Sequence, residues 1–105
     1  MLNGTIMIAQ ERERQVRKEG WTTHEDQQKH PDGELSIAAA CYAVEGTYAK
    51  CVANHYDRYT TIQDAWPWHP EWDKRKKHDR IRRLIIAGAL IAAEIDRLLA
   101  ESERP

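Results

Sequence analysis

The sequence predicts a small all-α domain, a bundle of three to four helices that a second copy of the chain completes. Apolar positions recur at helical spacing, and no segment shows the alternation and tight-turn dipeptides of a β-hairpin. Residues 84–93 and 35–44 are two largely apolar segments, and a helix that is apolar on most sides must be covered on most sides. A single domain spanning residues 1–105, with 31% charged residues, has little material to cover both. We therefore expect a homodimer or a higher oligomer.

The first expected helix spans residues 6–19. Thr5 can cap its start, and Gly20 can end it because glycine readily adopts the left-handed conformation found there. Its apolar stripe is narrow, so we expect this helix on the outside of the bundle. The polar connection 21–33 follows, and a capping-box spacing inside it allows one short helical turn.

A second helix is expected over residues 34–45, with Asp32 as its cap, and its alanines let a partner helix approach closely. Apolar and aromatic positions at helical spacing then predict an amphipathic helix over 47–59. The alternative is one bent helix over 34–59 that contains Gly46, at a cost of about 1 kcal/mol relative to alanine.

Prolines exclude a regular helix from residues 60–77. The last helix is expected over 79–100, with Gly88 at its close contact with the 35–44 segment. The following residues form its predicted core stripe: Ile81, Leu84, Ile85, Gly88, Ile91, Ala92, Ile95, Leu98 and Leu99. Ile86, Leu90 and Ala93 widen this stripe to a second face.

Composition excludes several functional classes. Sixteen lysines and arginines nearly balance seventeen aspartates and glutamates, which argues against a nucleic-acid partner. Cys41 and Cys51 are too few for a disulfide framework. The apolar run 84–93 is far shorter than the roughly 20 residues that span a bilayer, and the first ten residues lack a secretory pattern. We therefore expect a cytoplasmic protein with no membrane partner.

Tryptophans beside arginines form the first candidate site. Trp21, Trp66 and Trp68 could stack a base, while Arg12 and Arg14 could hold phosphate. The alternative is that the Trp-Pro-Trp segment covers the helices and closes a core that contains no phenylalanine. This alternative leaves room for a pocket beneath the segment.

Carboxylates and imidazoles form a second candidate. Asp26, His30 and Glu34 could hold a divalent metal, although their spacing matches no recognised site and also suits capping and turn formation. Glu94 could join Glu34 as a carboxylate pair, as all-α nucleoside triphosphate pyrophosphohydrolases use to bind magnesium. Alternatively, Glu94 forms a structural ion pair with an arginine such as Arg14. No catalytic nucleophile arrangement is found.

Short segments distributed over most of the chain carry a family resemblance. They are Glu11–Gln15, Glu19–Thr22, Asp26, His30, Gly33–Leu35, Ala39–Ala43, Trp66–Trp68, Ala87–Ile91 and Ala93–Ile95. In order and character they resemble a widespread set of small phage and prophage proteins, found alone or as the C-terminal segment of longer accessory proteins. The resemblance excludes roughly residues 46–63 and implies a phage setting, but no particular catalysis. Gln27 stands where a second acidic residue is usual, which argues against a metal site there.

Three functions follow as hypotheses. We favour an oligomeric binder that captures a small molecule, such as a nucleotide signal of host defence. Its expected ligand-binding residues are Arg12, Arg14, Trp21, Asp26, His30, Trp66 and Trp68. One alternative is a magnesium-dependent nucleotide pyrophosphohydrolase with Glu34 and Glu94 at the metal, and another is a protein-protein adaptor that docks through its helical surface.

Overall fold

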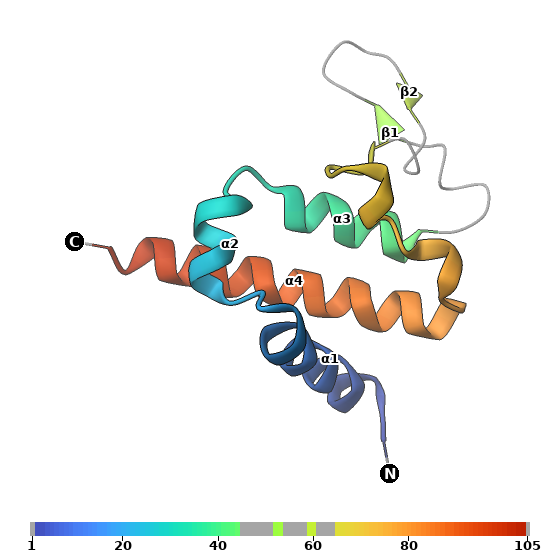
Figure 1. The fold of residues 1–105 in the computed structure, drawn as a ribbon, viewed down its shortest axis with the longest axis horizontal. Helices are drawn as coiled ribbons and strands as arrows, with labels where there is room; N and C mark the ends of the chain where they lie inside the picture. The colour runs from blue at the N-terminus through green and yellow to red at the C-terminus, as the bar shows by residue number, and fades with distance from the viewer. Residues whose placement is uncertain (1, 45–51, 54–58, 61–64, 105) are drawn as a thin grey trace.

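The computed structural model (Figure 1) describes residues 2–44, 52–53, 59–60 and 65–104, and these confirm the all-α prediction. The α-helices are α1 (Gly4–Glu19), α2 (Thr23–Lys29), α3 (Glu34–Ala43) and α4 (Arg80–Ser102). Two single-turn 3₁₀ helices, η3 (Pro70–Trp72) and η4 (Arg75–Lys77), precede α4. The two-residue strands β1 (Val52–Ala53) and β2 (Tyr59–Thr60) pair in antiparallel fashion.

Helix α4 is the central element of the fold. Figure 1 shows α3 running along one side of α4 and α1 crossing it on the other, and α2 also contacts α4. The alanines of α3 let its backbone approach α4 closely, as the sequence predicts. The core cluster consists of Leu35, Ala38, Ala39 and Tyr42 from α3 with Ile86, Ala87, Leu90 and Ala93 from α4.

The close contact at Gly88 involves a different helix from the one predicted. A Cβ atom placed on Gly88 would lie 2.6 Å from Cδ1 of Ile8, which belongs to α1 and not to α3. Glycine at this position therefore lets α1 cross α4 at short distance. The expected contact of Gly88 with the 35–44 segment is wrong.

The predicted core stripe of α4 is also largely wrong for a single chain. Among the described residues, Ile85 belongs to the buried face of α4, whereas the large apolar residues that remain exposed are Ile81, Leu84, Ile91, Ile95, Leu98 and Leu99. The predicted second face of α4, formed by Ile86, Leu90 and Ala93, is the one that is buried, because α3 packs against it. In the described part of the chain, no helix has the combined length and apolar character needed to cross a membrane.

Helix ends follow local chemistry, with some corrections. Gly20 ends α1 with φ of 74°, as predicted. The N-cap of α1 is Asn3, whose side chain accepts from the backbone N–H of Ile6, and not Thr5. The N-cap of α3 is Gly33, with φ of 90°, and not Asp32.

The predicted helix over 47–59 is wrong where the structure describes it. Val52, Ala53 and Tyr59 lie in strands, and the rest of that prediction falls outside the described residues. The single bent helix over 34–59 is excluded because α3 ends at Ala43 and Val44 is extended. Short runs of aromatic and β-branched residues suit a strand as well as a helix, which explains the error.

Candidate functional site

A cavity of about 890 Å³ lies against one side of α4. It is enclosed by the end of α1, by α2 and α3, and by the segment 66–78 that leads into α4. This volume is typical of a small-molecule site. Its wall combines charged residues with five tryptophan and tyrosine side chains, namely Trp21, Tyr42, Trp66, Trp68 and Trp72.

Trp66 is the centre of the aromatic wall. Its ring packs edge-on against Tyr42 at 5.9 Å and against Trp68 at 5.4 Å between centroids. The guanidinium of Arg75 lies 5.3 Å from its ring centroid, and its indole N–H donates to the carbonyl of His69 at 3.3 Å. Trp66 and Trp68 pack against the core cluster as well. Trp66 and Trp68 therefore both cover the core and line the cavity. The two interpretations in the sequence analysis, a ligand site and a core-closing segment, are compatible.

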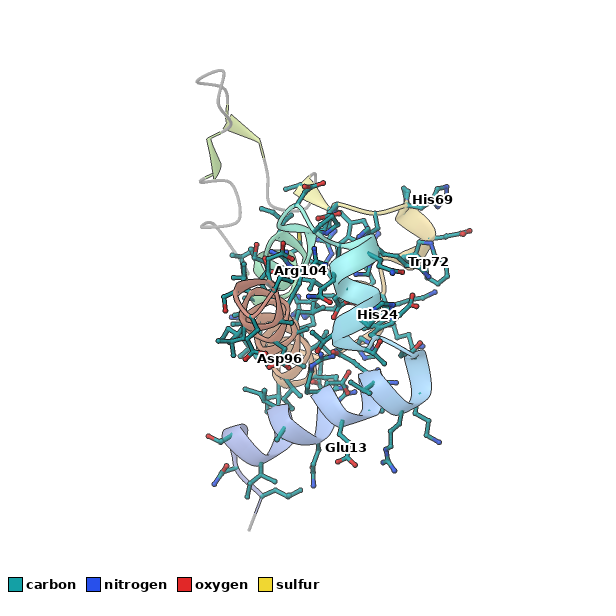
Figure 2. All side chains as sticks on the ribbon, turned by 90° about the vertical axis from the view of Figure 1, so that its left-hand side faces the viewer. Glu13, His24, His69, Trp72, Asp96 and Arg104 are labelled. Atoms are coloured by element: carbon teal, nitrogen blue, oxygen red, sulfur yellow. The ribbon has the colours of Figure 1, made fainter. Side chains whose placement is uncertain are left out.

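The outer part of the same segment faces solvent. Figure 2 shows His69 and Trp72 extending outward, away from the helices. Trp72 is 62% exposed although it lines the cavity. Trp72 therefore belongs to the exposed rim of the cavity.

Asp26 and His30 form a carboxylate–imidazole pair at the cavity. They are one turn apart on α2, and Nδ1 of His30 lies 3.0 Å from Oδ1 of Asp26. Asp26 is only 1% exposed. The His30 ring also packs against Trp68 at 5.0 Å between centroids. This pairing orients the imidazole and joins α2 to the aromatic wall.

Arg12 does not line the cavity, but it contacts two residues that do, Trp21 and Asp26. One guanidinium nitrogen donates to the carbonyl of Trp21 at 2.9 Å, and another lies 3.9 Å from Oδ2 of Asp26. Its Nε lies 3.6 Å from a carboxylate oxygen of Asp96. Arg12 therefore positions other residues of the site, and the prediction that it holds a ligand has no geometric support.

A buried glutamate lies at the junction of α1 and α4. Arg14 donates to both carboxylate oxygens of Glu11, at 2.8 and 2.9 Å, and Arg82 from α4 also donates to Glu11. Gln15 contributes a further amide hydrogen bond at 3.2 Å. Burial raises the pKa of Glu11, but the two arginines outweigh this effect and hold the pKa below its usual value of 4.5. Glu11 is therefore ionised near neutral pH.

This cluster could not be recognised in the sequence. Glu11 and Gln15 are polar residues on a helix with a weak apolar stripe, and they read as exposed. They are instead the buried residues of α1. Their partner Arg82 is far away in the chain. The available signal was that Glu11, Arg14 and Gln15 lie within one turn of each other on α1.

The cavity also carries positive charge from lysines. Lys29 pairs with Glu25 at 2.8 Å, and Arg14 is committed to Glu11 and to Glu19. Lys74 and Lys77 also line the cavity, and neither forms an ion pair within the described ranges. These two ammonium groups are available to an anionic ligand.

The predicted site residues divide into two groups. The structure brings together, around one cavity, the following predicted residues: Arg14, Trp21, Asp26, His30, Trp66 and Trp68. Glu34 and Glu94 do not line it. Glu34 accepts from the backbone N–H of Asp32 at 2.6 Å, and Glu94 pairs with Arg97 at 2.5 Å. Glu94 thus forms a structural ion pair, although with Arg97 and not with Arg14.

The residues that the structure describes contain no group of three or more histidine, cysteine, aspartate or glutamate side chains placed to hold a metal ion. The chain matches no protein-family model, no curated protein and no solved structure. Its function is therefore inferred from the cavity.

Proposed function

We propose that the protein is a phage- or prophage-encoded oligomeric binder that captures a small nucleotide-type ligand in this cavity. The observation that carries the proposal is that aromatic rings and unpaired lysines meet in one cavity of about 890 Å³. Nucleotides combine a planar ring with a negatively charged group, and they need both of these surfaces. The phage setting rests on the family resemblance of the sequence.

The aromatic wall supports the recognition of a base. Stacking of a nucleobase on an aromatic side chain contributes about 1–3 kcal/mol and tolerates different bases. Trp66 and Trp68 are already held by Tyr42, by each other and by the core. A preorganised wall loses little side-chain entropy when a ligand binds, so more of the stacking energy appears as affinity.

The lysines support the recognition of an anion. Lys74 and Lys77 precede α4 and lie on the same cavity as the tryptophans. Arg14 lines the cavity too, but each of its three side-chain nitrogens donates to Glu11 or Glu19, so it supports the wall. We therefore assign the phosphate-binding role to the two lysines instead of the arginines.

Ligand binding can be tested by calorimetry with nucleoside mono-, di- and triphosphates and cyclic dinucleotides. Lys77→Met should weaken the binding of a phosphate-bearing ligand by about 5- to 10-fold, since a contact to a charged group is lost. Lys76→Met is the matched control, because Lys76 is an exposed neighbour in η4 that does not line the cavity. Absence of binding by the wild-type protein to every nucleotide of this panel would contradict the proposal. Release of pyrophosphate from a triphosphate would favour the hydrolase instead.

The outer face of α4 supports self-association. Ile81 and Leu84 precede the crossing of α1 at Gly88, whereas Ile91, Ile95 and Leu98 follow it and are exposed at the alternating spacing of three and four residues that forms a helix-pairing seam. Burying one such side chain stabilises a complex by roughly 1.5–3 kcal/mol. Because these side chains are exposed in one chain, a second copy would cover them.

Light scattering over a range of concentrations tests this part of the proposal. Wild type should be a dimer or larger, and Ile95→Glu should be monomeric because it places a charge in the seam. Gln28→Glu adds the same charge on an exposed position of α2 and should leave the assembly unchanged. A wild-type monomer at all concentrations would contradict self-association and leave the seam for another protein, as in an adaptor.

A further inference from the structure

Three polar atoms on cavity-lining residues lack a hydrogen-bond partner in the described part of the chain. They are Oε1 of Gln15, Oδ2 of Asp26 and Nε1 of Trp68. Buried polar groups are nearly always paired in folded proteins, so an exception at a cavity calls for an explanation. Oδ2 of Asp26 has a charged neighbour, because a guanidinium nitrogen of Arg12 lies 3.9 Å away. Gln15 is equally buried, at 1% exposure, and its oxygen has no such neighbour, which makes its exception the most informative.

The direction of the Gln15 amide follows from its neighbour. Its nitrogen donates to Oε2 of Glu11 at 3.2 Å. An ionised carboxylate can only accept hydrogen bonds, so the amide must present its NH₂ group to Glu11 and turn its oxygen away. Arg14 and Arg82 both donate to Glu11 and favour its ionised form. Oε1 is thus left as an unpaired acceptor on a residue that lines the cavity.

Trp68 supplies the opposite function. An indole nitrogen is a donor only. The ring is held between His30, at 5.0 Å, and Trp66, at 5.4 Å between centroids. Rotation of the indole would disrupt both contacts, so its N–H is a donor with a defined position.

We propose that Gln15 and Trp68 select the ligand by its hydrogen-bonding pattern, with Gln15 accepting from an amino or ring N–H group and Trp68 donating to a ring nitrogen or carbonyl oxygen. The edges of nucleobases carry donors and acceptors of these kinds. This inference rests on the proposed function and deepens it, because stacking and charge alone would not distinguish one base from another. A site with a buried acceptor rejects an analogue that lacks the matching donor, since the acceptor then stays unpaired.

Pairs of nucleotides that differ by one amino group test the inference. The first pair is adenosine 5′-monophosphate and purine riboside 5′-monophosphate, and the second is cytidine 5′-monophosphate and its 4-deamino analogue. Within each pair, stacking and phosphate contacts are preserved. In at least one pair, calorimetry should show that the wild type binds the amino-bearing member at least about tenfold more tightly than the member that lacks the amino group.

Two variants separate the roles of the residues. Gln15→Met keeps the length of the side chain and removes the acceptor, so it should abolish the preference within the pair without weakening the member that lacks the amino group. Gln10→Met, at an exposed position of the same helix, is the control and should retain the preference. Trp68→Phe removes the N–H, keeps a ring, and should weaken both members of the pair equally. It tests the inference independently if Gln15→Met does not fold.

The outcomes distinguish this inference from the proposed function. Nucleotide binding without any preference for the amino-bearing member would overturn the inference and leave the function intact. An undiminished preference in folded Gln15→Met would also overturn it, as would unchanged affinity in Trp68→Phe. Absence of binding by every nucleotide would overturn both.

Discussion

Replacement of Glu11 by glutamine should destabilise the protein by about 2–3 kcal/mol at neutral pH. The Glu11 side chain is 1% exposed and accepts hydrogen bonds from Arg14, Gln15 and Arg82. A glutamine of equal length offers one acceptor oxygen and turns an NH₂ group towards donors. Arg14 and Arg82 remain 41% and 35% exposed, so water compensates part of the loss. The cost therefore lies below the roughly 3–5 kcal/mol of a fully buried broken pair.

The pH dependence of this effect has a defined sign. Burial raises the pKa of Glu11, but the arginines outweigh it, and the folded pKa lies below 4.5. A carboxylate with a lowered folded pKa contributes stability that is fully present above its unfolded pKa and is lost as the pH falls through the folded value. Glutamine at position 11 does not titrate. The difference in stability between wild type and Glu11→Gln should therefore shrink on acidification below pH 4.5.

Urea unfolding followed by circular dichroism measures both effects. The expected loss corresponds to a Tm decrease of roughly 10–20 °C for a domain of this size. Glu13→Gln is the matched control, because Glu13 points away from the bundle (Figure 2), is 63% exposed and pairs with Arg17 at 3.5 Å. That control should cost less than about 0.5 kcal/mol. Equal effects of the two substitutions, or a Glu11→Gln effect that persists unchanged in acid, would refute the reasoning.

Three further predictions follow from close packing and burial. Gly88→Ala should gain no stability in the wild type because its Cβ meets Ile8, but should stabilise an Ile8→Ala background by about 1 kcal/mol through helix propensity. Equal effects in both backgrounds, in chemical denaturation, would argue against the contact. Burial raises the pKa of Cys41, so in a Cys51→Ser background this thiol should react with an alkylating reagent far more slowly than in the unfolded chain, and equal rates would contradict its burial. Burial and neighbouring cations lower the pKa of His78 below 6.5, so its NMR titration should fall below that value and its contribution to stability should decrease as the pH falls from 6.5. A midpoint at or above 6.5 would show that the ring is solvated.

Local signals explain which elements were predictable. Helix α1 ends at Gly20 and α4 begins after Asp79, because each boundary depends on a residue beside it. The helix predicted over 47–59 failed at its described positions, since aromatic and β-branched residues in a short run suit either structure. The aromatic part of the site was predictable because tryptophans between prolines cannot continue a helix and must pack or line a surface.

The remainder of the site depends on residues that are far apart in the chain. Glu11 and Gln15 appear in sequence as ordinary exposed residues of a polar helix, and only the approach of Arg82 makes them a buried network. Two apolar stripes run along α4, and sequence periodicity ranks the stripe with Ile95 and Leu98 as core. In one chain that stripe is exposed, because α3 covers the neighbouring stripe.

The sequence by itself determined the all-α class, the start of the last helix and a set of aromatic and charged residues suited to a ligand. Those features depend on backbone propensities, capping and periodicity, which act over a few residues. Only the tertiary structure decided which face of α4 is buried, that Ile8 of α1 packs against Gly88, and that Gln15, bonded to Glu11, lines the cavity. Each of these outcomes depends on the packing of whole helices, whose free energy comes from contacts between distant parts of the chain.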